Sequence, residues 1–412
     1  MIKFSSLSVV QGHAPDSAYS WLRLGGALVV GTVACVALWS VVAAIPEIQA
    51  EFKTSRAEAS FGFTAMMLGF GFGTVAMGKI ADRYGIIPPL FGSAILLFIG
   101  YVIAGMAPNL WIYWFAHTFF IGIGGAAGFS PMMSDISHWF VRRRGLAVVL
   151  AACGSYIAGA LWPMVMNQTI PLYGWRATHI GIGIAALVIL LPMTMLFRQK
   201  PLKSTMVAAE AAQEAARGSL GVQPNTLQAL LTFAGIACCV AMAMPQVHIV
   251  AYCGDLGYGV SSGREMLSLM LGLGVVSRIA SGFMADKIGG AATLLIGSFM
   301  QAVALALYLF FNGLSSLYWI SAIFGLFQGG IVPMYAVLVR EFLPPREAGF
   351  RVSIVISATV LGMAIGGYIS GLIFDLTASY RWAFLHGLAW NSVNLGLAGW
   401  LWYRRQKALA KS

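Results

Sequence analysis

Long apolar runs separated by short polar stretches follow one another along most of the 412-residue chain. Each run has about 20 residues, the length that a helix needs to cross a bilayer. The runs do not alternate between apolar and polar positions, so they predict helices and not the strands of a membrane barrel. The twelve predicted spans lie at 24–46, 59–78, 87–106, 110–133, 145–168, 175–197, 227–251, 263–284, 291–311, 316–339, 351–374 and 382–403.

A polar stretch divides these spans into two sets of six, and the two sets repeat a motif. GKIADRYG at 78–85 is matched by GFMADKIG at 282–289, which places Asp82 and Asp286 204 residues apart. Two parallel repeats around a midplane site are a known transporter plan. We therefore expect an all-α membrane protein of two pseudo-symmetric six-helix bundles. Its expected parts are an N-terminal segment 1–23, a bundle 24–197, a linker 198–226, a bundle 227–403 and a tail 404–412.

Composition and charge agree with a membrane protein. Hydrophobic residues make up 59% of the chain and charged residues 9%, against roughly 25% charged in soluble domains. With the N-terminus placed in the cytoplasm, nineteen of the 25 lysines and arginines fall on the cytoplasmic side and five outside. This asymmetry is the usual signal of topology. It explains the net charge of +11 without nucleic-acid binding, and it predicts an inner-membrane protein with both termini in the cytoplasm.

The duplicated loops resemble the signature of the major facilitator superfamily. In that superfamily these loops latch the two halves in the outward-facing state, so the resemblance assigns gating roles to Asp82, Arg83 and Asp286. Two further stretches, DSAYSW at 16–21 and WFVRRRGLA at 139–147, resemble the monocarboxylate transporter family. The bacterial oxalate/formate antiporters share this pattern. Asp135 and Arg143, beside the second stretch, are predicted to belong to a gate network.

Arg278 is the one lysine or arginine that lies deep inside a predicted span, since Arg176, Arg264 and Arg351 stand within the first two residues of theirs. A cation at that depth is costly, so it usually faces a cavity or a counter-charge. Its planar fork suits a carboxylate, and it matches the arginine of the eighth helix that binds substrate in monocarboxylate transporters. The alternative is a structural cation, but no acid lies in the middle of any span. The resemblance also implies a proton-linked acid one turn earlier, where this chain has Gly274.

Other polar residues inside the spans are weaker candidates for the site. His117 can donate a hydrogen bond and titrate, although a packing histidine is the alternative. Interhelical hydrogen bonding is the commoner use of such residues. His248 and His386, near predicted outer ends, fit interfacial histidines better. The remaining candidate binding residues are Gln328, Tyr335, Thr32 and Asn391.

These observations predict a secondary transporter that moves a small monocarboxylate of the lactate or pyruvate kind. Symport with a proton is the expectation from the family, with the coupling left open. An organic anion exchanger of the oxalate/formate type is the alternative within the class, and a membrane sensor or enzyme is the alternative outside it. No cofactor, metal site or catalytic group is expected, and the partners are the substrate and the lipid bilayer, with the protein a monomer.

Overall fold

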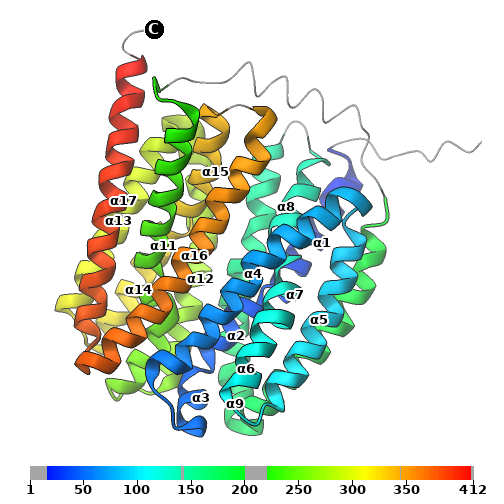
Figure 1. The fold of residues 1–412 in the computed structure, drawn as a ribbon, viewed down its shortest axis with the longest axis vertical. Helices are drawn as coiled ribbons and strands as arrows, with labels where there is room; N and C mark the ends of the chain where they lie inside the picture. Colours follow the sequence, from blue (N-terminus) through cyan, green and yellow to red (C-terminus); the bar gives the residue numbers. More distant parts are fainter. Residues whose placement is uncertain (1–15, 141–142, 200–219, 344, 410–412) are drawn as a thin grey trace, which may run out of the picture.

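The computed structural model describes residues 16–140, 143–199, 220–343 and 345–409. All regular elements in these ranges are helices (Figure 1). The first half contains α1 (Ala18–Ala34), α2 (Val36–Ala43), α3 (Ile45–Phe52), α4 (Arg56–Tyr84), α5 (Ile87–Gly105), α6 (Leu110–Ala116), the π-helical η1 (His117–Gly122), α7 (Ile123–Ala126), α8 (Ser130–Ser137) and α9 (Arg144–Leu196).

The second half repeats this pattern after the linker. It contains α11 (Pro224–Asp255), α12 (Val260–Ile288), α13 (Gly290–Phe310), α14 (Leu314–Gln328), α15 (Ile331–Phe342), α16 (Pro345–Thr377) and α17 (Tyr380–Leu409). The predicted linker falls largely on residues 200–219, which lie outside the described ranges.

Ten stretches of the described chain are long and apolar enough to cross a membrane. One of them, Gly145–Leu196, turns at Gly174, where φ is 78°. Such a backbone favours glycine, and the turn divides this stretch into the fifth and sixth predicted spans. The 30-residue α17 corresponds to the twelfth. The predicted all-α fold with twelve membrane helices is therefore confirmed.

The duplicated loops have the same backbone geometry. Gly85 ends α4 with φ 88°, and Gly289 ends α12 with φ 87°. Because an L side chain is strained at these angles, glycine is required at both positions. The sequence repeat is thus a repeat of structure.

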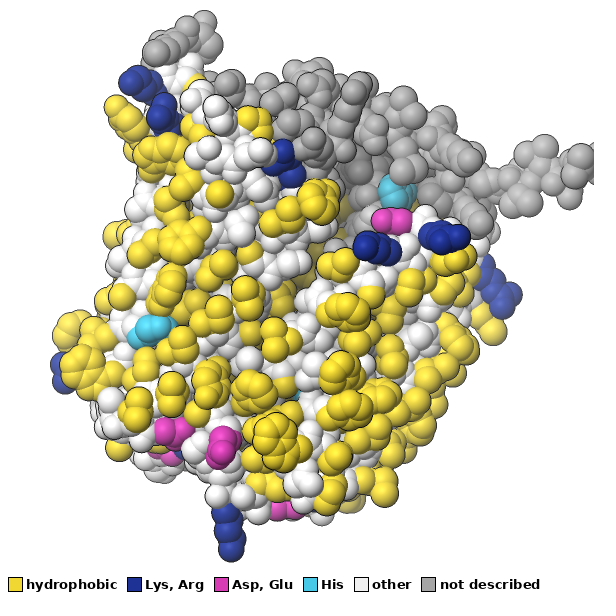
Figure 2. Space-filling model, in the orientation of Figure 1, with side chains coloured by type: hydrophobic (Ala, Val, Ile, Leu, Met, Phe, Trp, Pro, Cys, Tyr) yellow, Lys and Arg dark blue, Asp and Glu magenta, His cyan; other side chains and the backbone are white. Residues whose placement is uncertain are grey.

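The two halves of the chain lie side by side (Figure 1). Helix α4 packs against α16, and α9 against α12; these two pairs make the main contact between the N-terminal and C-terminal bundles. Hydrophobic side chains cover the flank of the molecule in Figure 2, and most charged side chains on this face lie toward its two ends. This is the distribution that a bilayer requires.

We call the end where α4 and α17 finish the linker end, and the end that holds α3 and the start of α4 the opposite end. At the opposite end, polar side chains of the two bundles contact each other directly. The linker end differs, since its two described ion pairs, Arg23 with Asp135 and Arg405 with Glu341, each join groups of one bundle. The structure is therefore closed at the opposite end.

Candidate functional site

Arg278 lies on α12 at the contact between the two bundles, and only 3% of it is exposed. Its Nε donates to the carbonyl oxygen of Gly329 at 3.1 Å, in the break between α14 and α15. Its Nη1 donates across to the N-terminal bundle, to the carbonyl oxygen of Ala152 at 2.6 Å, with Ser155 Oγ 3.5 Å away. One guanidinium thus joins the two halves of the molecule.

The aromatic ring of Tyr156 covers this guanidinium. Arg278 Cζ is 4.1 Å from the ring centroid, a distance at which the ring quadrupole attracts the cation. The same ring explains Gly274, one turn earlier on α12. A Cβ atom at position 274 would lie 2.3 Å from two carbon atoms of the ring. Tyr156 therefore occupies the place where a side chain at position 274 would project.

The hydrogen bonds described above use only Nε and Nη1 of the guanidinium. Nη2 of Arg278 makes no hydrogen bond with any residue that the structure describes. None of the ion pairs among the described residues includes Arg278 either. A buried cation without a counter-charge is the arrangement expected of an anion-binding group.

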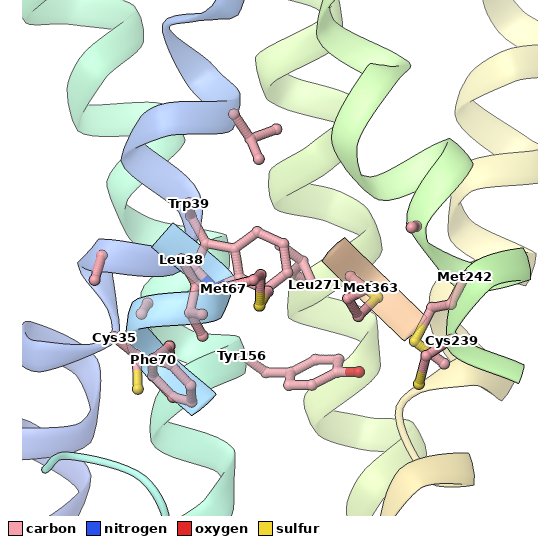
Figure 3. Close-up of a cluster of buried hydrophobic side chains, with 14 of the residues drawn as sticks. Cys35, Leu38, Trp39, Met67, Phe70, Tyr156, Cys239, Met242, Leu271 and Met363 are labelled. Atoms are coloured by element: carbon pink, nitrogen blue, oxygen red, sulfur yellow. The ribbon is translucent and has the colours of Figure 1, made fainter. Parts of the chain in front are cut away.

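An apolar cluster that includes Tyr156 lies between the two bundles. Figure 3 shows side chains of the N-terminal bundle facing those of the C-terminal bundle, with Tyr156 pointing across toward Cys239. Trp39 is fixed by a hydrogen bond of 2.8 Å from its Nε1 to the carbonyl oxygen of Ser155. The buried residues of this apolar belt are Cys35, Leu38, Trp39, Met67, Phe70, Tyr156, Cys239, Met242, Leu271 and Met363.

Of the predicted binding residues, Gln328 is the one whose chain neighbour, Gly329, contacts Arg278. It ends α14, directly before the carbonyl group that accepts from Arg278. Its Oε1 accepts a hydrogen bond from Gln246 of α11, while its buried Nε2 finds no partner among the described residues. Gln246 was missed by the sequence analysis because it follows Pro245 inside an apolar run and gives no periodic signal.

Tyr335 and Asn391 lie together, but in a different cluster. The Tyr335 hydroxyl is 2.6 Å from Asn394 Oδ1 and 3.0 Å from the Ala234 carbonyl oxygen. Asn391 Nδ2 donates to the carbonyl oxygen of Ser298 at 2.9 Å. All of these groups belong to the C-terminal bundle, so their contacts bind α11, α13, α15 and α17 to one another and not to Arg278.

His117 and Thr32 belong to the interior of the N-terminal bundle. His117 is fully buried, its Nδ1 donates to the Tyr113 carbonyl oxygen at 2.9 Å, and its ring lies 4.1 Å from that of Tyr113 and 6.2 Å from that of His179. The carbonyl oxygen of Thr32 accepts from Trp162 Nε1 at 2.9 Å. The structure does not bring either residue into contact with Arg278.

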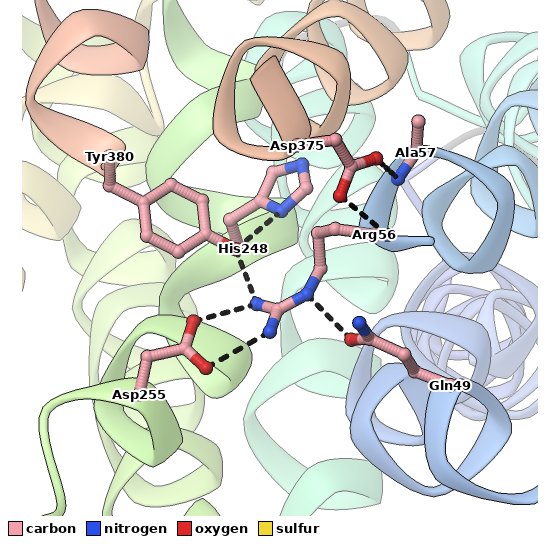
Figure 4. Close-up of polar contacts among 7 residues, drawn as sticks. All are labelled: Gln49, Arg56, Ala57, His248, Asp255, Asp375 and Tyr380. Atoms are coloured by element: carbon pink, nitrogen blue, oxygen red, sulfur yellow. Dashed lines mark hydrogen bonds and ion pairs between the residues drawn. The ribbon is translucent and has the colours of Figure 1, made fainter. Parts of the chain in front are cut away.

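A second polar cluster closes the opposite end, and Arg56 is at its centre (Figure 4). The guanidinium of this α4 residue makes two hydrogen bonds of 3.0 Å to the carboxylate of Asp255 on α11. It also donates to Gln49 at 2.6 Å and to the Tyr380 hydroxyl at 2.5 Å. The cluster thus ties α3 and α4 of one bundle to α11 and α17 of the other.

Asp375 adds a contact between a helix end and a charge. Its two carboxylate oxygens accept from the backbone N–H groups of Arg56 at 2.9 Å and Ala57 at 2.7 Å. These donors stand at the start of α4, where the helix dipole favours a negative charge. An acid of the C-terminal bundle therefore caps a helix of the N-terminal bundle.

Four more contacts cross at or near this end. Arg264 of α12 donates to the Ala43 carbonyl oxygen at 3.0 Å and forms an ion pair with Glu47 of α3. Asn167 Nδ2 donates to Ser261 Oγ at 2.8 Å, and Thr64 Oγ1 donates to the Ala364 carbonyl oxygen at 2.9 Å. We call the whole set around Arg56, Asp255, Asp375 and Arg264 the opposite-end latch.

His248 also belongs to this region, and its expected interfacial position is wrong. The residue is fully buried. Its Nε2 lies 2.8 Å from the Gly367 carbonyl oxygen and its Nδ1 3.2 Å from the Tyr380 hydroxyl. Since the carbonyl group can only accept, Nε2 carries the proton and Nδ1 accepts from Tyr380. The histidine therefore positions the Tyr380 hydroxyl, which in turn accepts a hydrogen bond from Arg56.

The residues predicted to gate the linker end are arranged differently. Asp82 and Asp286 are exposed, and neither takes part in an ion pair within the described ranges. The guanidinium of Arg83 lies 5.2 Å from the ring of Tyr84, and that of Arg143 lies 6.0 Å from the ring of Trp21.

Asp135, the remaining predicted gate residue, is held by α1. Arg23 donates two hydrogen bonds of 2.8 Å to its carboxylate, and Arg23 itself is 1% exposed. The pair joins α1 to α8 inside the N-terminal bundle. A bidentate pair of this kind fixes the relative position of two helices.

Comparison with known proteins places this architecture in a family. The model of the Major Facilitator Superfamily matches residues 27–324 and 265–412. The MFS-type transporter opdF of Penicillium oxalicum is 24% identical over 377 residues, which cover 87% of this chain and 84% of that protein. Monocarboxylate transporter 13 of Bos taurus is 23% identical over 382 residues, covering 91% of this chain and 87% of the relative.

A solved structure confirms the fold. A bacterial homologue of the human lysosomal transporter Spinster, in an inward-facing and occupied conformation, superimposes with a TM-score of 0.71 at 14% identity, over 96% of this chain and 98% of that one. The resemblance to monocarboxylate transporters found in the sequence is likewise confirmed by the relatives. The chain belongs to the Major Facilitator Superfamily.

Proposed function

We propose that the protein is a secondary transporter that carries a small monocarboxylate across a bacterial inner membrane by alternating access. Arg278 supports this proposal most directly. It is a buried guanidinium between the two bundles, its Nη2 forms no hydrogen bond with a described residue, and none of the described carboxylates forms an ion pair with it. A substrate carboxylate would supply the missing counter-charge.

The apolar belt supports a substrate whose remaining part is small and uncharged. Its members carry thiols, thioethers, aliphatic chains and aromatic rings. A second carboxylate placed among them would be buried without a cation, which costs several kcal/mol even after relaxation. Monocarboxylates of the lactate or pyruvate kind fit this charge balance, whereas oxalate leaves one charge unpaired.

In this proposal the structure corresponds to the inward-facing state. The termini and the linker end face the cytoplasm, and the opposite-end latch closes the outer side. Opening the site to the outside would then require release of Arg56 from Asp255 and of Asp375 from the start of α4. The exposed Asp82 and Asp286 would form the inner latch only in the other state.

An organic anion exchanger remains the second candidate, and Gly274 favours it. This chain cannot couple protons through an acid one turn before Arg278, because position 274 is a glycine and the ring of Tyr156 occupies the space that a side chain there would need. Competition by mono- and dicarboxylates for the purified protein separates a monocarboxylate carrier from an oxalate carrier.

The test of the site is substitution of Arg278 in protein reconstituted into liposomes. We expect Arg278→Gln to abolish uptake of labelled lactate and pyruvate. Arg278→Lys should impair it by about tenfold or more, since lysine lacks the planar fork. Lactate and pyruvate should compete at neutral pH and oxalate should not. Full uptake by Arg278→Gln, or tight binding of oxalate, would refute the assignment.

A further inference from the structure

A group of three buried polar side chains inside the N-terminal bundle belongs neither to the Arg278 site nor to the opposite-end latch. It consists of Tyr113, His117 and His179, and all three side chains are completely buried. The rings of Tyr113 and His117 have centroids 4.1 Å apart, and the ring of His179 lies 6.2 Å from each of them. We call these three residues the tyrosine–histidine cluster.

Both imidazole rings of the cluster are fixed by one of their nitrogen atoms. The chain changes from α-helical to π-helical geometry at His117, where η1 begins; short π-helical turns are rare and are often found at functional sites. Nδ1 of His117 donates to the carbonyl oxygen of Tyr113 at 2.9 Å. His179 of α9 is held in the same way, because its Nδ1 donates to the carbonyl oxygen of Trp175 at 2.9 Å.

These hydrogen bonds determine what the other nitrogen atom of each ring can do. A carbonyl oxygen only accepts, so Nδ1 carries the proton in both histidines, and Nε2 of the neutral ring is an acceptor. The Nε2 atoms of His117 and His179 and the hydroxyl group of Tyr113 are buried and have no hydrogen-bond partner among the described residues. The cluster thus holds two acceptors that need a donor and one hydroxyl group that can donate.

The three groups cannot satisfy one another. One O–H group can donate to only one of the two nitrogen atoms, and the other lone pair would stay unbonded in the interior of the bundle, which is costly. A second proton on one ring would turn its Nε2 into a donor, but it would also bury a positive charge. No ion pair among the described residues includes either histidine.

We propose that the tyrosine–histidine cluster is a binding site for a single water molecule. A water molecule can donate to both Nε2 atoms and accept from the Tyr113 hydroxyl group, so it matches the number of donors and acceptors. Two hydrogen bonds of about 2.8 Å at one oxygen atom join groups about 4–5 Å apart, which suits two rings whose centroids are 6.2 Å apart. Buried waters typically make about three such bonds to groups that lack another partner.

The water joins parts of the N-terminal bundle that are distant in the sequence. Tyr113 and His117 come from α6 and η1 and His179 from α9, so the water links the fourth predicted span to the sixth. Gly62 of α4 leaves room for the tyrosine, since a Cβ atom there would lie 3.0 Å from Cε1 of its ring. The site therefore helps the N-terminal bundle to move as one body during the alternating access proposed above, whichever substrate is carried.

Hydroxyl-radical footprinting of the unmodified protein in liposomes tests the site. A short X-ray pulse converts water into hydroxyl radicals, which oxidise the side chains next to that water even where bulk solvent does not reach them. We expect Tyr113 to be oxidised severalfold faster than Tyr308, with His117 and His179 modified as well. Tyr308 is the control because it is 2% exposed and its hydroxyl group already pairs with Ser321 at 2.8 Å. Oxidation of Tyr113 no faster than that of Tyr308 would overturn the proposal.

Two substitutions of one residue test the count of donors and acceptors. His179→Phe removes an acceptor and fills its place with an apolar ring, whereas His179→Gln keeps an acceptor in its amide group. The fast oxidation of Tyr113 and His117 should be lost in the phenylalanine variant and kept in the glutamine variant. Equal oxidation of Tyr113 in the two variants would refute the count. A stoichiometric metal ion in the purified protein, found by elemental analysis, would overturn the choice of water. If neither variant folds, footprinting of the unmodified protein still decides the inference.

Discussion

The opposite-end latch should set how often the outer side opens, and Asp255→Asn is the substitution that tests it. Asparagine keeps the shape of the side chain but removes the charge opposite Arg56. The Arg56 side chain is 7% exposed and that of Asp255 36%, so the pair lies between a surface ion pair and a buried one. We therefore expect the closed state to lose ~1–2 kcal/mol, which raises the population of the open state roughly 5- to 30-fold.

Cysteine labelling can measure this population. Thr64 is buried behind the latch, where its hydroxyl contacts Ala364 of the other bundle, and cysteine is nearly the same size. The native cysteines are free and buried, so Thr64→Cys should add the main reactive thiol. Its rate of reaction with a membrane-impermeant maleimide, applied from the outer side, should rise with Asp255→Asn by the factor given above.

Glu51→Gln provides the matched control. Glu51 pairs with Arg176 at 2.7 Å at the same end of the molecule, but both residues belong to the N-terminal bundle. Its neutralisation removes a comparable ion pair without loosening the contact between bundles, so the labelling rate should not change. The reasoning fails if Glu51→Gln accelerates labelling as much as Asp255→Asn, or if Asp255→Asn leaves the rate at its original value.

Four other substitutions have definite expected outcomes. Gly274→Ala should displace the ring of Tyr156, destabilise the protein by ~1–3 kcal/mol and weaken pyruvate binding; unchanged affinity in a binding titration would contradict the proposed packing. Asp82→Asn and Asp286→Asn should favour the state seen here, because neither acid forms an ion pair with a described residue in it, and should slow labelling behind the opposite-end latch. His117→Gln should cost ~1–2 kcal/mol of stability and leave the pH profile of uptake unchanged, since the histidine packs inside one bundle; an altered profile would implicate it in coupling.

The membrane helices and the repeat could be predicted because both depend on local sequence. Apolar runs give the spans directly, and the motif at 78–85 and 282–289 requires its glycines for a turn that the structure reproduces at both places. Arg278 could be identified for a similar reason, because a lone cation inside an apolar run is visible without knowledge of its neighbours.

The partners of these residues could not be predicted, because they come from distant parts of the chain. In the sequence, Tyr156 is one aromatic residue among others in an apolar run. Its contact with Arg278 becomes visible only when α9 is packed against α12. Asp255 and Asp375 stand at helix ends, where acids are common, and they meet Arg56 across 199 and 319 residues of sequence. Depth in the membrane makes Tyr335 and Asn391 candidates for the site, but depth alone does not tell which way a helix face points.

The break between α14 and α15 has a consequence for the direction from which an anion can reach the site. The last carbonyl groups of a helix lack partners within it and carry partial negative charge, and Arg278 donates to the one at Gly329. That side of the guanidinium already faces the negative pole of a half-helix, which repels a carboxylate. If Arg278 binds a carboxylate as proposed, the anion should therefore approach on the side of Nη2, away from α14. The end of this short helix would then determine from which side the substrate reaches the arginine.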